Sequence, residues 1–161
     1  MAHIPESLKS FLSDSSAIFV GAGVDRDVTN LRNDYGLIVS NVVDLQPLAM
    51  TLKDSPFFGS KLPGLQNMAW VFVGLRMEKP SDVTMSNWED KELSREQIKY
   101  ACIDAYASYK IGYKLLVGSE GGVGLGWRLL KLMVYCVGLG WRLRKLMVYL
   151  VGIWIALDWF F

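Results

Sequence analysis

Residues 94–116 read SREQIKYACIDAYASYKIGYKLL, and this segment has the clearest helical pattern in the chain. Ser94 and Gln97 have the spacing of a capping box, in which two side chains satisfy free backbone amides at the start of a helix. No glycine or proline follows until Gly112, and apolar side chains recur at helical spacing. The pattern predicts a long helix with a buried face over these residues.

Tyr100 and Asp104 lie four residues apart in this segment, so a helix stacks them on one face. A carboxylate on an otherwise apolar helix is costly to bury unless it meets a metal, a proton or a basic partner. We therefore expect chemistry at this pair. The structural alternative is a core tyrosine beside a buried carboxylate that is paired with Lys99 or Lys110.

Charge and composition favour no particular partner for the whole chain of 161 residues, whose net charge is +1. Residues 1–116 carry a net charge of −2, whereas residues 117–161 carry +3 and four of the six tryptophans. Cys102 and Cys136 are far apart and lack metal-ligand spacing, so neither a zinc site nor a disulfide framework is indicated. With no secretory signal at the start, we expect an intracellular protein of the nucleus or cytoplasm.

The first half of the chain has the pattern of alternating strands and helices. Residues 17–21 form a short apolar run typical of a buried strand, and a glycine turn at residues 21–23 leads into a polar helix. Asp27 falls in the first turn of that helix, where α/β folds place ligands. The full GxGxxG pattern is absent, so a tight turn is a better interpretation of the glycines than a phosphate site.

Further elements are predicted by the same signals. Gly36 is expected to end the helix over residues 25–34, and Asp44 is expected to cap a later one. The remaining expectations are a strand at residues 37–43, a short helix at residues 46–50, a core helix at residues 62–77 and a polar loop at residues 79–87.

The C-terminal part contains a duplicated segment of 14 residues. Residues 123–136 (VGLGWRLLKLMVYC) and 137–150 (VGLGWRLRKLMVYL) agree at 12 of 14 positions. The longest uncharged run of this C-terminal part, residues 146–157, has 12 residues, whereas a membrane span needs about 20. Three interpretations stay open: an appended duplication without a role of its own, attachment to a membrane surface, or a partner-binding helix.

Three linked motifs together resemble one family. The Tyr100-Ala-Cys-Ile-Asp104 motif looks like the YxxxD signature of DEDDy 3′–5′ exonucleases, and the glycine turn followed by Asp27 is similar to their second motif. The intervening run, from Lys79-Pro80 through Ser86-Asn87-Trp88 to Gln97, is similar to the Werner-syndrome-like exonucleases, nearest to their plant branch. The resemblance covers residues 4–116.

This resemblance implies a ribonuclease H-like (DnaQ-like) α/β fold and two-metal phosphodiester hydrolysis with Mg²⁺ or Mn²⁺. By that likeness Asp27 and Asp104 would ligate metal, and Tyr100 would position the attacking water. The implied substrate is single-stranded or 3′-recessed nucleic acid. Lys79 and Trp88 have two interpretations each, a nucleic-acid contact or a solvated lysine and a buried tryptophan.

The family's first motif, a DxE on an early strand, does not precede Ile4. The resemblance thus implies an N-terminally truncated domain, an incomplete metal site and weak or absent exonuclease activity. We also expect uncovered apolar surface on residues 17–20 and on the long helix. Residues 1–116 are assigned to a partial exonuclease domain and residues 117–161 to an apolar, basic, helical tail. The alternative function is non-catalytic binding of nucleic acid or a partner, with membrane contact through the tail.

Overall fold

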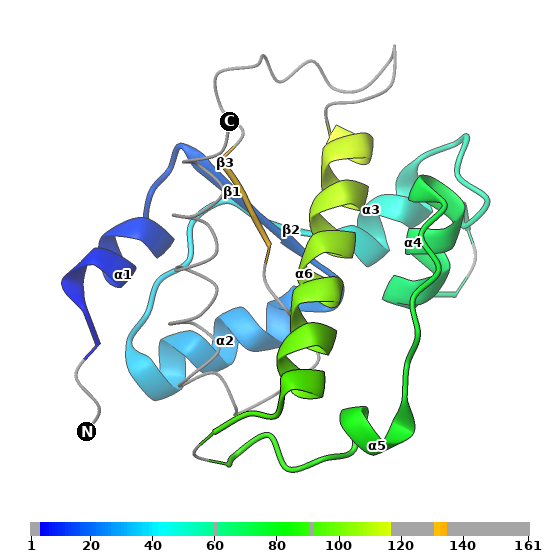
Figure 1. Ribbon diagram of the computed structural model, residues 1–161. Coiled ribbons are helices and arrows are strands. Elements are labelled where there is room, and N and C mark those ends of the chain that lie inside the picture. Colours follow the sequence, from blue (N-terminus) through cyan, green and yellow to red (C-terminus); the bar gives the residue numbers. More distant parts are fainter. Residues whose placement is uncertain (1–3, 60, 91, 117–130, 135–161) are drawn as a thin grey trace.

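The computed structural model describes residues 4–59, 61–90, 92–116 and 131–134. Helices lie on both sides of a small central sheet, which gives the expected α/β class (Figure 1). In chain order the elements are α1 (Glu6–Leu12), β1 (Ala17–Gly21), α2 (Val24–Tyr35), β2 (Val42–Asp44), α3 (Leu45–Thr51), α4 (Leu65–Val73), α5 (Ser81–Thr84), α6 (Arg95–Leu116) and β3 (Lys131–Val134).

The sheet is parallel, with the strand order β2-β1-β3. Ile18 of β1 lies opposite Leu132 of β3, and Gly21 lies opposite Asp44 of β2. Because the carboxyl ends of parallel strands reach the same edge of a sheet, the glycine turn after β1 lies beside the start of α3. This register therefore brings the turn after β1 next to the start of α3, and these two segments form one half of the candidate site.

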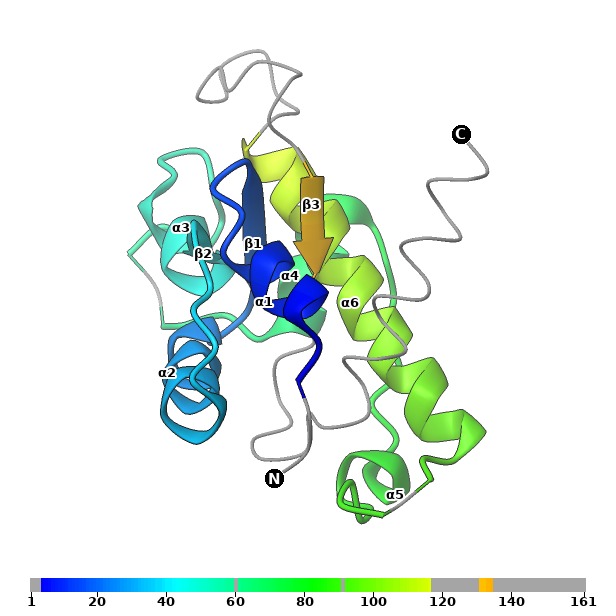
Figure 2. The same cartoon turned by 90° about the vertical axis from the view of Figure 1, so that its left-hand side faces the viewer.

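Successive side chains of β1 enter two different cores, as the pleat of a strand requires. Ala17 and Phe19 pack in the core formed with α1 and α2, whereas Val20 packs in the core formed with α3, α4 and α6. Figure 2 shows α2 and α6 on opposite sides of β1. The sheet is therefore the middle layer of three, and the continuous apolar run of β1 follows from burial on both faces.

The predicted capping box at the start of α6 is confirmed. The Gln97 amide donates to Ser94 Oγ at 3.1 Å, and the Ser94 amide donates to Gln97 Oε1 at 2.7 Å. The Gln97 side-chain nitrogen also donates to Ser86 Oγ at 2.9 Å and to the Asn87 carbonyl at 3.0 Å. Gln97, which is only 5% exposed, thus fixes both the start of α6 and the loop before it.

The predicted second strand at residues 37–43 is wrong in length, because β2 spans only Val42–Asp44. Leu37 and Val39 are buried by packing against the core of α1 and α2. Asn41 has a φ of 49°, a left-handed conformation that interrupts an extended strand. The apolar pattern of the segment therefore reflects burial without strand pairing.

The helix predicted at residues 62–77 is also shorter than expected. The observed α4 starts after Gly64 and ends at Gly74, whose φ of 66° stops the helix while its amide donates to the Trp70 carbonyl. Met68 and Ala69 are fully buried, but Trp70 and Val71 are exposed. The polar segment at residues 79–87 is not all loop, since it contains the single turn α5.

The expectation of uncovered apolar surface on residues 17–20 is wrong. β3 pairs with β1 on the edge opposite β2, with Ala17 opposite Lys131 and Val20 opposite Val134. Ala17 and Val20 are 0% exposed, and Phe19 is 2% exposed. A strand supplied by residues beyond 116 thus covers a backbone edge that would otherwise be open to pairing with another chain.

Within the expected helical tail, the structure describes residues 131–134, and these form a strand instead of a helix. The rest of the duplicated segment lies outside the described residues, as do the expectations of membrane or partner contact that rest on it. No helix in the described ranges combines the length and apolar character needed to cross a bilayer.

Candidate active site

Tyr100 and Asp104 form a hydrogen-bonded pair on α6. The Tyr100 hydroxyl donates to the Asp104 carboxylate, as the four-residue spacing predicts. Burial raises the pKa of Asp104 from 3.8 to about 6, while the bond from Tyr100 and the positive charge of Lys79 act in the opposite direction. The site thus holds a carboxyl group whose charged form is short of favourable partners.

The cation that acts on Asp104 belongs to a different element from the one expected. Lys79 precedes α5 and is exposed, so its charge reaches Asp104 from the loop between α4 and α5. Lys110, an expected partner, instead places its ammonium 5.7 Å from the centroid of the Tyr106 ring. Pairing of Asp104 with Lys99 or Lys110 is therefore wrong.

The ring of Trp88 packs near the ring of Tyr100. The two ring centroids are 6.3 Å apart with an interplanar angle of 57°, and Trp88 is only 2% exposed. It packs in a small core with Val83, Ala101 and Ala105. This burial decides between the two interpretations of Trp88, since a ring enclosed in this way offers no face to a nucleic-acid base.

Asp27 lies in the first turn of α2 and is 6% exposed. Its pKa is raised from 3.8 to about 6, chiefly by burial. A backbone hydrogen bond and the neighbouring Arg26 lower the pKa, while the negative charge of Asp44 raises it. Asp27 is thus a second carboxyl group with a raised pKa, and it is buried at the carboxyl end of the sheet.

Asp44 ties the two βα turns together, a role that the sequence analysis missed. Its carboxylate accepts from the Gly23 amide at 3.1 Å, the Val24 amide at 3.0 Å and the Gln46 amide at 2.9 Å. The predicted cap of α3 is confirmed, and the same group also occupies the first amides of α2. The glycine turn is a tight turn whose Gly23 and Val24 amides are bound by a side chain.

A sequence signal for this bridge existed in the placement of Asp44. It ends the strand next to β1, and Gly21 is its partner in the sheet. Two parallel strands that end at one edge bring their following turns together, so a short acceptor after one strand can reach free amides after the other. Recognising this required knowing that β1 and β2 are neighbours.

Asp27 and Asp104 are the candidate metal ligands among the described residues. No group of three or more His, Cys, Asp or Glu side chains that could hold a metal ion occurs in the described ranges. Tyr100 donates a hydrogen bond to Asp104, whereas the charged groups that act on the pKa of Asp27 are Arg26 and Asp44. Two carboxylates alone leave most of the coordination shell of Mg²⁺ to other ligands.

Comparison with known proteins identifies the family to which this fold belongs. The family model described as 3′–5′ exonuclease matches residues 2–117. The chain belongs to the 3′–5′ exonuclease family. The resemblance read from the linked motifs is thereby confirmed, and with it the ribonuclease H-like α/β fold.

Relatives from plants and animals carry the same assignment. A 3′–5′ exonuclease of Arabidopsis thaliana is 38% identical over 113 residues, which cover 70% of this chain and 38% of the relative. Exonuclease 3′-5′ domain-containing protein 2 of Homo sapiens is 30% identical over 113 residues, covering 70% of this chain and 18% of the relative. The chain thus spans well under half the length of these curated relatives.

Two further comparisons give lower sequence identities. The bifunctional 3′-5′ exonuclease/ATP-dependent helicase WRN of Mus musculus is 27% identical over 115 residues, covering 71% of this chain and 8% of the relative. The crystal structure of the EXD2 exonuclease domain soaked in Mn is 29% identical, with a TM-score of 0.32, and the match covers 71% of this chain and 55% of that one.

Proposed function

We propose that this chain carries part of a 3′–5′ exonuclease active site that acts on nucleic acid at single-stranded or 3′-recessed ends. The observation that supports it is the hydrogen-bonded Tyr100–Asp104 pair on α6, in a chain of the exonuclease family. In this proposal Asp104 and Asp27 are metal ligands for Mg²⁺ or Mn²⁺, and Tyr100 orients water through its hydroxyl group.

The raised pKa values of both aspartates are consistent with these roles. Burial disfavours their ionised forms more strongly than the charges of Arg26 and Lys79 favour them, so a bound divalent cation would relieve the cost and lower both pKa values. The Tyr100 hydroxyl is held beside the carboxylate at the same time. A hydroxyl group in this position can orient the oxygen of a water molecule next to the carboxylate oxygen of Asp104 that it already contacts.

We further propose that this chain alone is weakly active or inactive. The described residues supply two such carboxyl groups, Asp27 and Asp104, and no third acidic ligand that would complete a metal-holding group. Mg²⁺ gives up its waters reluctantly and binds few-carboxylate sites weakly unless the substrate contributes ligands. Slow turnover is therefore the expected result.

The test is degradation of 5′-labelled DNA and RNA oligonucleotides, single-stranded or 3′-recessed, by the full chain with Mg²⁺ or Mn²⁺. Asp104→Asn is the matched variant, since it removes the charge but keeps the size of the side chain. A faint ladder from the 3′ end that disappears in Asp104→Asn supports the site. Rapid degradation that Asp104→Asn abolishes overturns the expected weak activity. A ladder that Asp104→Asn leaves unchanged overturns the role of Asp104.

A readout besides activity separates metal binding from turnover. If Asp27 and Asp104 hold the cation, millimolar Mn²⁺ should raise the midpoint of thermal unfolding of the natural chain more than that of Asp104→Asn. Asp25→Asn is the control, because Asp25 lies in the same first turn of α2 but is exposed. Equal shifts in all three proteins would contradict the metal assignment.

The second candidate function is binding of nucleic acid without cleavage. It is favoured by one observation, that the described residues contain no group of three potential metal ligands. This function predicts oligonucleotide binding in the presence of a chelator and no shortening of the strand with any metal. Loss of binding in a chelator would argue against it.

A further inference from the structure

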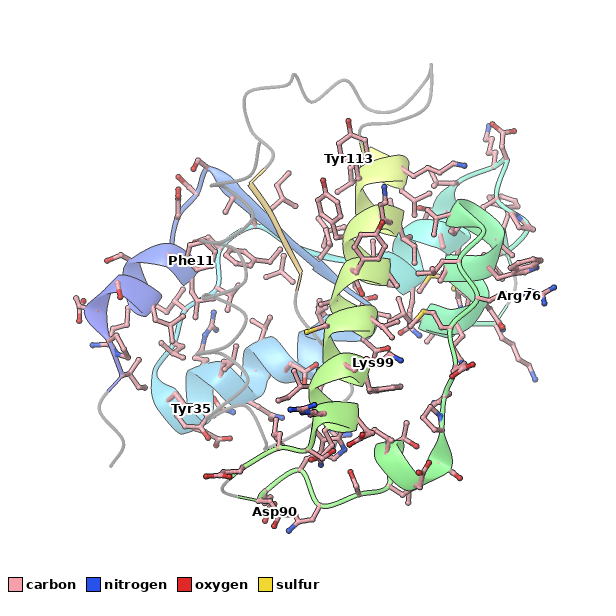
Figure 3. All side chains as sticks on the ribbon, in the orientation of Figure 1. Phe11, Tyr35, Arg76, Asp90, Lys99 and Tyr113 are labelled. Atoms are coloured by element: carbon pink, nitrogen blue, oxygen red, sulfur yellow. The ribbon has the colours of Figure 1, made fainter. Side chains whose placement is uncertain are left out.

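The outward side of α6 carries a row of exposed tyrosines and lysines that the proposed active site does not use. We call the five residues Lys99, Tyr106, Lys110, Tyr113 and Lys114 the tyrosine–lysine face. The three lysines are exposed, and the tyrosines are 52% and 38% exposed at positions 106 and 113. Figure 3 shows Lys99 in the lower half of α6 and Tyr113 near its upper end.

This face is separate from the catalytic pair. Asp104 and Tyr106 are two residues apart, and residues two apart on a helix point to nearly opposite sides. From Lys99 to Lys114 the rise of about 1.5 Å per residue gives a row about 22 Å long. The row is thus long enough to follow several units of an extended polymer.

One ring–cation pair lies within this face, and Tyr113 packs near Tyr109, a half-buried tyrosine beside the face. The Lys110 ammonium lies 5.7 Å from the centroid of the Tyr106 ring. The Tyr109 and Tyr113 rings lie 6.2 Å apart with an interplanar angle of 38°. A ring held beside an ammonium presents a flat apolar surface and a positive charge together, which a single nucleotide matches with its base and its phosphate.

The charge of the exposed side of α6 is positive. Arg95, Lys99, Lys110 and Lys114 are exposed there, whereas Glu96 is the exposed acidic residue of the same helix. Lys99, Lys110 and Lys114 form no ion pair with another residue in the part of the chain that the structure describes. This positive charge is complementary to a partner that carries negative charge along its length.

We propose that the tyrosine–lysine face is a second binding surface for single-stranded nucleic acid, apart from the site at Asp104. Lysines contact phosphates and tyrosines stack on bases, so recognition does not depend on sequence. The choice of nucleic acid as the polyanion rests on the proposed function. Binding at this face needs no metal, so it can be measured apart from cleavage.

The experiment measures fluorescence anisotropy of a 5′-labelled oligothymidylate titrated with the full chain in a chelator, at several salt concentrations. The test variant is Lys110→Ala/Lys114→Ala, which keeps good helix formers in α6. The matched control is Arg32→Ala/Lys53→Ala, which removes two exposed cations from α2 and from the segment after α3. Circular dichroism confirms that each variant is folded.

Loss of two phosphate contacts should lower the slope of log Kd against log salt by about 1.4, whereas the control should keep the natural slope. Tyr106→Ala should weaken binding roughly fivefold or more, and Tyr106→Phe should retain it because the ring remains. Equal slopes for the test and control variants would overturn the proposal, as would undiminished binding by Tyr106→Ala.

Two further outcomes separate this proposal from others. Displacement of the oligonucleotide by polyglutamate as readily as by unlabelled oligonucleotide would overturn it in favour of a surface for acidic proteins. No binding by the natural chain would overturn it as well, while the proposed exonuclease site would still be judged by cleavage. Conversely, this binding is measured in a chelator and without cleavage, so a failure of the catalytic assignment does not affect the measurement.

Discussion

Gly112 of α6 lies directly against Val20 of β1. A Cβ atom built on Gly112 would come within 2.9 Å of Val20 Cγ2 and 3.2 Å of Val20 Cγ1. These distances are shorter than the van der Waals contact of two carbon atoms, so the glycine sets how closely the helix approaches the sheet. That approach also fixes the position of Tyr100 and Asp104, which belong to the same rigid helix.

Gly112→Ala should therefore destabilise the chain, although alanine is the better helix former. Overpacking costs about 1–3 kcal/mol, and the gain in helix propensity offsets about 1 kcal/mol of it. Val20→Ala removes the two Cγ atoms that the new methyl group meets, so Gly112→Ala should cost less in that background. Urea unfolding of the four proteins of this cycle checks the prediction, and strictly additive effects would contradict the close contact.

Asp44→Ala should lower the free energy of unfolding by about 2–4 kcal/mol, because one charged acceptor serves three backbone amides. Asp44→Asn keeps a carbonyl oxygen and should lose less. Asp25→Ala is the control, since it removes an exposed acidic side chain from the first turn of α2. Urea unfolding measures all three variants. A loss for Asp44→Ala no larger than that for Asp25→Ala would show that the bridge contributes little.

The pairing of β3 with β1 predicts a specific cross-link. In a background with Cys102→Ser and Cys136→Ser, Ile18→Cys combined with Leu132→Cys should form a disulfide on mild oxidation, since the two positions are opposite in the sheet. The second copy of the repeat offers a matched control, Ile18→Cys with Leu146→Cys, because the residues around it are the same. Equal rates of cross-linking for the two pairs would contradict the assignment of the first copy to β3.

Local signals in the sequence predicted α6, β1 and α2 well. The capping box of Ser94 and Gln97, the apolar run of β1 and the terminating Gly36 each act through neighbouring residues. The position of Asp104 beside Tyr100 is likewise local, because four residues make about one turn of helix.

Features that depend on distant parts of the chain were not predictable in the same way. β3 pairs with a strand more than a hundred residues earlier, and four apolar or basic residues in a repeat do not indicate which strand they will join. Lys79 reaches Asp104 from another loop, so a search for partners along α6 named the wrong lysines. Asn41 has a left-handed φ, which shortens β2. Its side-chain nitrogen donates a hydrogen bond to the carbonyl of Ala17, a residue far away in the sequence.

The partial burial of Asp104 makes the stability of the chain depend on pH. Its pKa in the folded chain is about 6, above its ordinary value of 3.8, so the folded state binds the proton more tightly than the unfolded state. The protonated Asp104 carboxyl group contributes to the free energy of unfolding. This contribution is fully present below about pH 3.8 and is lost as the pH rises through about 6. Asp27 acts in the same direction, with a pKa also raised to about 6.

Asp104→Asn should thus be more stable than the natural chain above pH 6, because the amide has no charge to bury and can still accept from the Tyr100 hydroxyl. The difference in the free energy of unfolding should shrink as the pH falls toward 3.8, where the natural carboxyl group is protonated in both states. Urea unfolding across this range measures the difference, with Asp25→Asn as the exposed control. A stability difference between Asp104→Asn and the natural chain that does not change with pH would contradict the raised pKa. If Asp104→Asn were less stable than the natural chain above pH 6, the ionised carboxylate would have a stabilising partner.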